Sequence, residues 1–247
     1  IKFSNQEFYG NLIFPTTANR DRRNRGIAYR YIENANYQPA RDGRGGGINL
    51  NEANAMADQI VNFMTNRKEE SLGVAVINNK QRGVLQTIFD QRSSSNPSVR
   101  EYLTKWAKED EGLNEFFIKN LENVQGDERD VIMVGTVYGP TAEGGRVAQR
   151  FGDIVKTHGE RRLNVLFTRA RNQLFLFTSL KPTDILITPN SKEGVKTLRK
   201  YLIFAETKEL QEATLTSRPV PSAFQQWGID VVNSVPGFSC DSEIGAQ

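Results

Sequence analysis

The sequence has little cysteine and histidine, and these shortages exclude several classes of site. Cys240 and His158 are single occurrences among 247 residues, so no disulfide can form within the chain. Structural zinc sites draw four ligands mainly from cysteine and histidine, and this chain cannot supply such a set. We therefore expect no metal site, a reducing compartment such as the cytoplasm, a solvated loop around His158, and no role for Cys240.

Long apolar runs and a strong excess of one charge are also missing. No segment approaches the roughly 18–20 apolar residues that cross a bilayer, so we expect no membrane partner. The 32 basic and 29 acidic residues leave a net charge of +3, which permits nucleic-acid binding without requiring it. The sequence starts at Ile1 and ends abruptly, and we interpret it as a piece of a longer polypeptide.

Complete catalytic motifs are absent as well. The sequence contains no Gly-x-x-x-x-Gly-Lys-Ser/Thr phosphate loop, no Gly-x-Ser-x-Gly and no His-Glu-x-x-His. The run GRGGG at 43–47 has neither a strand before it nor a Lys-Ser/Thr pair after it, which favours a flexible loop. The chain therefore lacks a full active site of any of these kinds.

What the sequence does contain is an alternation of strand and helix patterns. Strands are expected at 26–37, 71–78, 115–125, 129–139 and 173–180. Helices are expected at 1–14, 49–68, 80–92, about 97–110 and about 191–209, with Asn49 or Asn51 as the N-cap of the second. One more helix is expected just before the last strand. Several strands are apolar on both faces, which predicts an α/β fold with a mostly parallel sheet flanked by helices in three layers. The composition shifts after about residue 214, so we expect a domain over 1–213 and a linker or second domain over 214–247.

Three stretches carry a family resemblance. They are GVAVINNKQR (73–82), ENVQGDERDVIMVGTVYG (122–139) and GERRLNVLFTRAR (159–171). Their order and spacing resemble motifs IV, V and VI in the second RecA-like domain of superfamily 1 DNA and RNA helicases, in the branch with 5′-to-3′ members. Residues 3–15 also look like the segment after the Tyr-Arg motif that opens this domain, so the resemblance covers about residues 1–180.

The resemblance implies an ATP-dependent helicase with the P-loop NTPase fold. ATP and Mg²⁺ would be bound mainly by an upstream RecA-like domain that carries the Walker motifs, and this chain alone would be inactive. Arg169 matches the arginine finger, the group that stabilises charge developing on the γ-phosphate. The implied ATP-binding residues are Gln81, Arg82, Gln125, Gly126, Glu128 and Arg169.

Physical chemistry supports parts of this set. Gly126 lets the backbone approach a phosphate or ribose closely, and Glu128 offers an acceptor for a ribose hydroxyl or a metal-bound water. In the alternative interpretation Arg169 and Arg171 pair with local carboxylates such as Glu128 or Glu160, and for Arg171 we favour it. Arg161 and Arg162 are interpreted as framework residues.

The resemblance also implies contacts with single-stranded DNA, or with RNA, at two strand ends. The residues concerned are Val76, Ile77, Asn78, Asn79, Thr136, Val137 and Tyr138. Asn, Thr and Tyr suit phosphate or sugar contacts, and Tyr138 could stack on a base. The pair Asn78-Asn79 departs from the Pro-Tyr often found at this place in the family.

The tail suggests a second resemblance. Residues 221–247 look like the start of an endonuclease-like domain related to very-short-patch repair nucleases, which would suit DNA repair, but the chain stops before the catalytic Asp. Two other functions stay open: a non-catalytic nucleic-acid-binding module with a degenerate helicase fold, and a nuclease fragment using Asp241 and Glu243.

Overall fold

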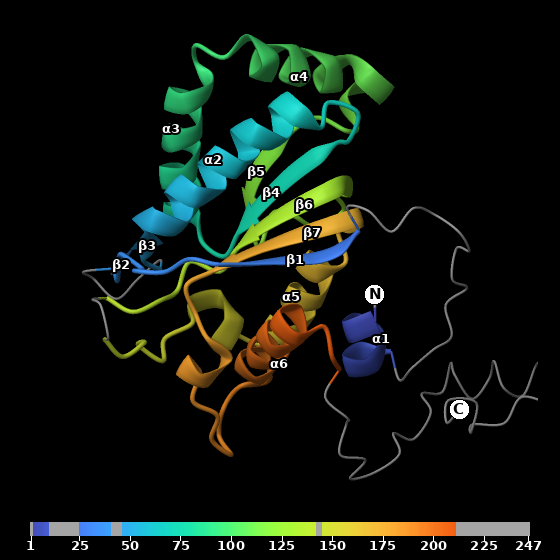
Figure 1. The fold of residues 1–247 in the computed structure, drawn as a ribbon. Coiled ribbons are helices and arrows are strands. Elements are labelled where there is room, and N and C mark those ends of the chain that lie inside the picture. Colours follow the sequence, from blue (N-terminus) through green and yellow to red (C-terminus); the bar gives the residue numbers. More distant parts are fainter. Residues whose placement is uncertain (1, 10–24, 41–45, 142–144, 211–247) are drawn as a thin grey trace, which may run out of the picture. The chain divides into compact units, whose positions relative to one another are not determined.

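A five-stranded, fully parallel sheet lies at the centre of the computed structural model (Figure 1). The structure describes residues 2–9, 25–40, 46–141 and 145–210. Each strand pairs in parallel with its neighbours. The strand order is β1 (Gly26–Tyr31), β7 (Ala170–Thr178), β6 (Arg129–Gly135), β4 (Leu72–Val76) and β5 (Phe117–Asn120).

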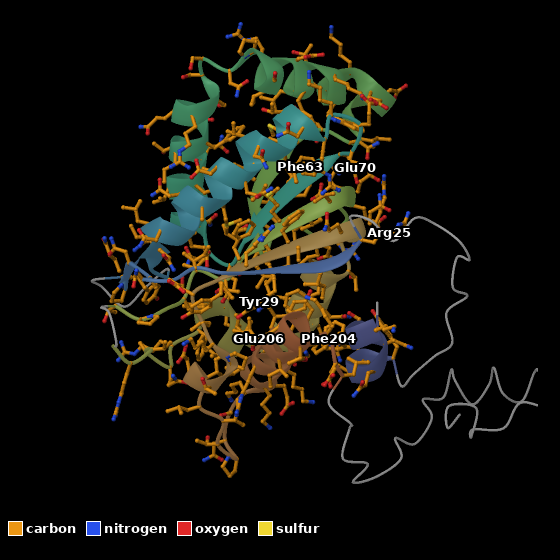
Figure 2. The ribbon with its side chains drawn as sticks, in the orientation of Figure 1. Arg25, Tyr29, Phe63, Glu70, Phe204 and Glu206 are labelled. Atoms are coloured by element: carbon orange, nitrogen blue, oxygen red, sulfur yellow. The ribbon has the colours of Figure 1, made fainter. Side chains whose placement is uncertain are left out.

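Helices cover both faces of this sheet. Figure 1 shows α2 (Leu50–Asn66), α3 (Asn79–Ser93) and α4 (Pro97–Lys108) on one face, with α5 (Gly159–Phe167) and α6 (Glu193–Thr207) on the other. In Figure 2, Phe63 of α2 and Phe204 of α6 lie on opposite sides of the sheet. The expected three-layer α/β fold, a RecA-like arrangement, is therefore confirmed.

The helix patterns explain why these segments form. The apolar residues of α2 recur at helical spacing and are buried, and the Asn49 side chain caps the helix by accepting a hydrogen bond from Glu52 N. The consecutive apolar residues of β4 and of the second half of β7 are buried on both faces of the sheet. Helix α1 (Lys2–Phe8) confirms the first expected helix and is described by itself.

Several expected strands are shorter in the structure. The strand expected at 26–37 ends at Tyr31, before Asn34 takes a left-handed φ of 52°. The strand expected at 115–125 is confined to β5, because a turn closes with Asn123 N donating to Asn120 O. Tyr37, expected at the end of that first strand, belongs instead to β2 (Tyr37–Gln38), which pairs antiparallel with β3 (Ile48–Asn49), a strand that was not expected.

The remaining expectations are partly testable. Between β6 and α5 the described residues contain a short 3₁₀ helix, η2 (Gly152–Val155), and two further 3₁₀ turns are η1 (Glu109–Gly112) and η3 (Pro182–Asp184). His158 is exposed, as expected of a solvated loop residue. Residues 41–45, which include the first three residues of the GRGGG run, and the tail from 211, with Cys240, Asp241 and Glu243, lie outside the described residues. Among the described residues no helix is long and apolar enough to span a membrane.

The parallel sheet has a carboxyl edge and an amino edge. The carboxyl edge contains the strand ends at Val76, Gly135 and Thr178 and the residues that follow them. The amino edge contains the residues just before and at the starts of β4, β6 and β7. Since the strands are parallel, a residue after a strand and a residue before a strand lie on opposite edges.

Candidate functional site

Arg169 lies on the amino edge, between the end of α5 and the start of β7. Its Nε donates to Val165 O at 2.9 Å, one turn back along α5, and its Nη2 donates to Thr168 Oγ1 at 3.3 Å. The side chain is 21% exposed. These bonds occupy Nε and Nη2. The third nitrogen, Nη1, lies 3.9 Å from Glu128 Oε1.

Glu128 lies between the two arginines of the motif. Arg171 Nε is 3.8 Å from Glu128 Oε2, and Arg171 Nη1 donates to Asn114 Oδ1 at 3.4 Å. Both distances to Glu128 exceed normal hydrogen-bond length, so the ion pairs are loose and solvent-screened. The predicted local pairing with Glu128 is therefore present, whereas Glu160 lies 3.8 Å from His158 instead.

The Gly-rich turn before β6 completes this part of the edge. Gly126 has φ +89°, a left-handed conformation that favours glycine, and a Cβ placed there would have open space around it. Gln125, Gly126 and Glu128 are exposed. The turn thus presents backbone and a carboxylate to solvent next to Arg169.

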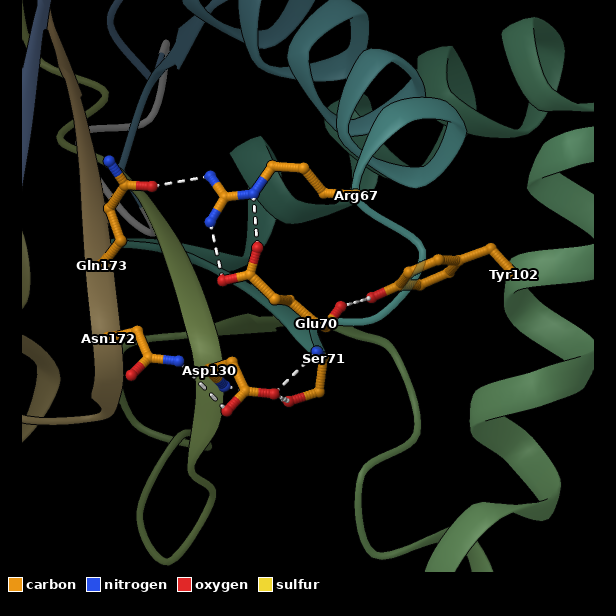
Figure 3. Close-up of polar contacts among 7 residues, drawn as sticks. All are labelled: Arg67, Glu70, Ser71, Tyr102, Asp130, Asn172 and Gln173. Carbon is orange, nitrogen blue, oxygen red and sulfur yellow. Dashed lines mark hydrogen bonds and ion pairs between the residues drawn. The ribbon is translucent and has the colours of Figure 1, made fainter. Parts of the chain in front are cut away.

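A second polar cluster braces the same edge (Figure 3). Arg67, at the end of α2, donates to both carboxylate oxygens of Glu70 at 2.7 and 2.8 Å and to Gln173 Oε1 at 2.6 Å. The Ser71 amide and hydroxyl donate to Asp130 Oδ2 at 2.9 and 2.7 Å. These bonds join the starts of β4, β6 and β7, so the cluster explains how the amino edge is held rather than what it binds.

The structure separates the predicted ATP-binding residues into two groups. Gln125, Gly126, Glu128 and Arg169 lie in the segments that lead into β6 and β7, whereas Gln81 and Arg82 follow β4 at the start of α3, on the carboxyl edge. Gln81 is fully buried, its Oε1 accepts from Asn49 N at 2.8 Å, and its Nε2 donates to Asn49 O at 2.9 Å. The Gln81 amide is thus occupied within the protein.

The predicted nucleic-acid residues do gather on the carboxyl edge, but nearly all are buried. Asn79 is exposed, whereas Val76, Ile77, Asn78, Thr136, Val137 and Tyr138 are at most 5% exposed. Asn78 caps α3 by accepting from Gln81 N at 2.9 Å and donates to Gly47 O at 3.0 Å. The Tyr138 ring packs edge-on against Tyr37 and Phe151. In this structure these residues shape the edge and leave its surface to others.

Exposed cations occupy that surface. Arg146 and Arg150, in the segment after β6, are exposed, and Arg82 is half-buried at the start of α3. Within the part of the chain that the structure describes, none of these three arginines has a carboxylate partner, whereas Lys105 of α4 pairs with Glu69 at 2.6 Å. Unpaired arginines of this kind suit phosphate groups.

One buried residue at this edge was missed by sequence reasoning. Glu52, in the first turn of α2, is fully buried, and both of its carboxylate oxygens accept from Val137 N, at 2.9 and 3.1 Å. Burial raises the pKa of the Glu52 carboxyl from 4.5 to about 8, while the hydrogen bonds from Val137 and Thr136 oppose that rise. The sequence alone does not mark Glu52 as buried. An acidic residue in the first turn of a helix is usually solvated, where it interacts favourably with the helix dipole.

Metal-binding clusters are not found. Among the described residues, no group of three or more His, Cys, Asp or Glu side chains is placed to hold an ion.

Known proteins share parts of this sequence. A family model described as an AAA domain matches residues 1–181. An uncharacterized ATP-dependent helicase of Mycoplasma genitalium is 34% identical to this chain over 215 residues, and its homologue in Mycoplasma pneumoniae is 32% identical over 208 residues. Each match covers 83% of this chain but 17% of the relative, so the chain spans a small part of these curated relatives' length.

A solved structure gives a weaker likeness. It is described as the C-terminal domain of a possible DNA helicase from Lactobacillus plantarum, with 10% sequence identity and a TM-score of 0.33 over 70% of this chain and 83% of that one. A likeness of that size supports no conclusion about activity.

Proposed function

The chain belongs to the AAA domain family, and from this premise we propose that it is a motor domain of an ATP-dependent nucleic-acid helicase or translocase. In this proposal it is the second RecA-like domain of a superfamily 1 enzyme. ATP and Mg²⁺ are held mainly by an upstream RecA-like domain of the same polypeptide, and this chain alone hydrolyses no ATP. The helicase relatives are much longer than this chain, which leaves room in them for such a domain.

The observation that carries the proposal is the way Arg169 is held. Its Nε is anchored on Val165 O, while Nη1 has only a loose ion pair with Glu128 at 3.9 Å. An arginine fixed at its base and weakly paired at its tip can turn to a γ-phosphate supplied by another domain at little cost. We infer that Arg169 is the arginine finger and that Glu128, Gln125 and Gly126 border the same nucleotide.

The carboxyl edge is the proposed track for single-stranded DNA or RNA. Asn79, Arg82, Arg146 and Arg150 provide polar and cationic groups there, and the positive end of the α3 dipole adds to their attraction for phosphate. In this proposal Arg82 contacts a phosphate of the nucleic acid. Gln81 and Asn78 instead form hydrogen bonds with the protein backbone at Asn49 and Gly47. The buried residues Val76, Ile77, Thr136, Val137 and Tyr138 support this surface from beneath.

The test is nucleic-acid-stimulated ATP hydrolysis by the full-length protein with Arg169→Ala. Removing an arginine finger should lower turnover by about 1,000-fold or more while ATP still binds. Arg171→Ala is the matched control, because Arg171 sits two residues away and shares Glu128. It is expected to leave turnover close to that of the wild type.

A second function is favoured by one observation. Glu128 lies within ion-pair distance of both Arg169 and Arg171, which gives both arginines a partner inside the domain. That arrangement also suits a non-catalytic nucleic-acid-binding module. Equal, small effects of the two alanine variants on ATP turnover would favour this module over the motor.

Three finer expectations remain predictions. They are the domain boundary near residue 214, the endonuclease-like tail over 221–247 with its implied link to DNA repair, and the cytoplasmic location. A cleavage assay with a mismatched duplex would test the tail in the full-length protein.

A further inference from the structure

We propose that Glu52 is a positioning residue for nucleic-acid binding, fixing the turn at 136–138 and with it the root of the segment that carries Arg146 and Arg150. The inference rests on the proposed function, because it assigns that segment to the nucleic-acid track. It concerns a residue of α2 that lies outside all three motifs of the sequence.

The turn has an unusual backbone. Tyr138 N donates to Thr136 O at 2.8 Å, which closes a three-residue γ-turn, and Val137 at its centre has φ +71°. A γ-turn with positive φ at its centre is rare, and a β-branched residue in that region is a marked outlier. Such a conformation persists only where the surrounding structure enforces it.

Glu52 supplies that enforcement. The Val137 amide cannot continue the β6 ladder after the bend, and it donates instead to both oxygens of the Glu52 carboxylate. The fit is tight, since a Cβ on Gly135 would lie 2.6 Å from Glu52 Oε1 and 2.6 Å from Met56 Sδ. Glu52 can reach the turn only because Gly135, the residue before the turn, has no side chain.

The hold extends to the neighbouring strand. The Thr136 hydroxyl lies 3.5 Å from Glu52 Oε2 and donates to the Thr178 hydroxyl at 2.8 Å. The Thr178 oxygen in turn accepts from Leu180 N at 3.1 Å. The ends of β6 and β7 are thus fixed relative to the first turn of α2.

The turn also sets the path of the chain that follows it. Tyr138 is wedged between Tyr37 and Phe151, and a Cβ on Gly139 would lie 2.7 Å from Ala35 Cβ. Further on, Gln149 Nε2 donates to Asp184 O at 2.9 Å, beside the exposed Arg150. In the proposed role, releasing the turn at 136–138 lets the chain that follows it shift, and Arg146 and Arg150 shift with it.

The experiment measures the affinity of the full-length protein for a labelled single-stranded oligonucleotide, with Glu52 changed. Glu52→Ala is expected to weaken binding by roughly tenfold, the equivalent of the strain that Glu52 now holds. Glu52→Gln keeps an oxygen that can accept from Val137 N and should restore binding close to that of the wild type. ATP affinity should be the same in all variants.

Two controls separate positioning from general destabilisation. Ile60→Ala removes a buried side chain two turns further along α2 and away from the turn, so it should lower stability without changing oligonucleotide affinity. Glu52→Asp withdraws the carboxylate by one methylene and should weaken binding as Glu52→Ala does; it decides the matter if Glu52→Ala does not fold.

Arg150→Ala distinguishes failure of this inference from failure of the proposed function. If Arg150→Ala weakens binding while Glu52→Ala and Glu52→Asp do not, Glu52 is no positioning residue and the track survives. An equal loss in Ile60→Ala overturns the inference as well. If Arg150→Ala and the Glu52 variants all bind like the wild type, the track itself is wrongly placed.

Discussion

At the scale of single residues, a buried carboxyl group ties the stability of this domain to pH. Glu52 is fully buried, and burial raises its pKa from 4.5 to about 8. Between these two values the folded chain holds a proton that the unfolded chain releases. The free energy of unfolding should therefore fall as the pH rises from about 4.5 to about 8 and level off above.

The measurement is urea unfolding of the wild type and Glu52→Gln at several pH values between about 5 and 8. The variant cannot titrate at this position, so the wild type should lose stability relative to the variant as the pH rises. A difference between the two that stays constant over this range would show that Glu52 titrates near its ordinary pKa.

The residue scale is also where sequence reasoning reached its limit. Glu52 and Gln81 look like solvated first-turn residues, because a polar residue at a helix start is usually exposed. Both are fully buried, because each is bonded to a distant part of the chain: Glu52 accepts from Val137 N, and the Gln81 amide pairs with the Asn49 backbone. Long-range contacts such as Glu52 with Val137 carry no local pattern from which they could be predicted.

At the scale of elements, the predictions succeeded where periodicity is long. The helices α2, α3 and α6 and the strands β4, β6 and β7 each carry enough apolar residues to fix their type. The pairs β2 and β3 consist of two residues each, which is too short for any periodicity. The strand β5 was expected to run too far, because Leu121 and Val124 are apolar and buried although they lie in a turn.

Helix caps offer a prediction at this scale. Asn49 is buried, caps α2 and donates to Ser179 Oγ at 3.0 Å, whereas the Asn96 side chain caps α4 by accepting from Ser98 N and Val99 N at 3.1 and 3.3 Å. Asn96→Ala should cost about 1 kcal/mol, and Asn49→Ala about 2–3 kcal/mol, because it also breaks a buried hydrogen bond. Urea unfolding of both variants checks this, and equal losses would mean that the Ser179 contact contributes nothing.

At the scale of the whole molecule, the parallel sheet separates two tasks. The finger candidate Arg169 and its neighbours lie on the amino edge, and the proposed nucleic-acid track lies on the carboxyl edge. The resemblance places Gln81, Arg82, Glu128 and Arg169 around one nucleotide, whereas within this domain Gln81 and Arg82 follow β4 and Glu128 and Arg169 precede β6 and β7. The common direction of the parallel strands puts these two pairs on opposite edges of the sheet.

This separation makes coupling between the edges the central claim. If the domain is a motor, a nucleotide contacted by Arg169 on the amino edge must change the affinity for nucleic acid on the carboxyl edge. A coupling of this kind typically changes affinity by about 5- to 150-fold. The coupling should be lost when Arg169 is replaced. The replacement should leave binding of nucleic acid in the absence of nucleotide unaffected.

The most direct measurement is therefore the affinity of the full-length protein for a single-stranded oligonucleotide, with and without a non-hydrolysable ATP analogue and Mg²⁺. The wild type should show a clear shift in affinity on adding the analogue, and Arg169→Ala should bind the oligonucleotide alone normally but show no shift. The same shift in both proteins, or none in the wild type, would contradict the motor proposal.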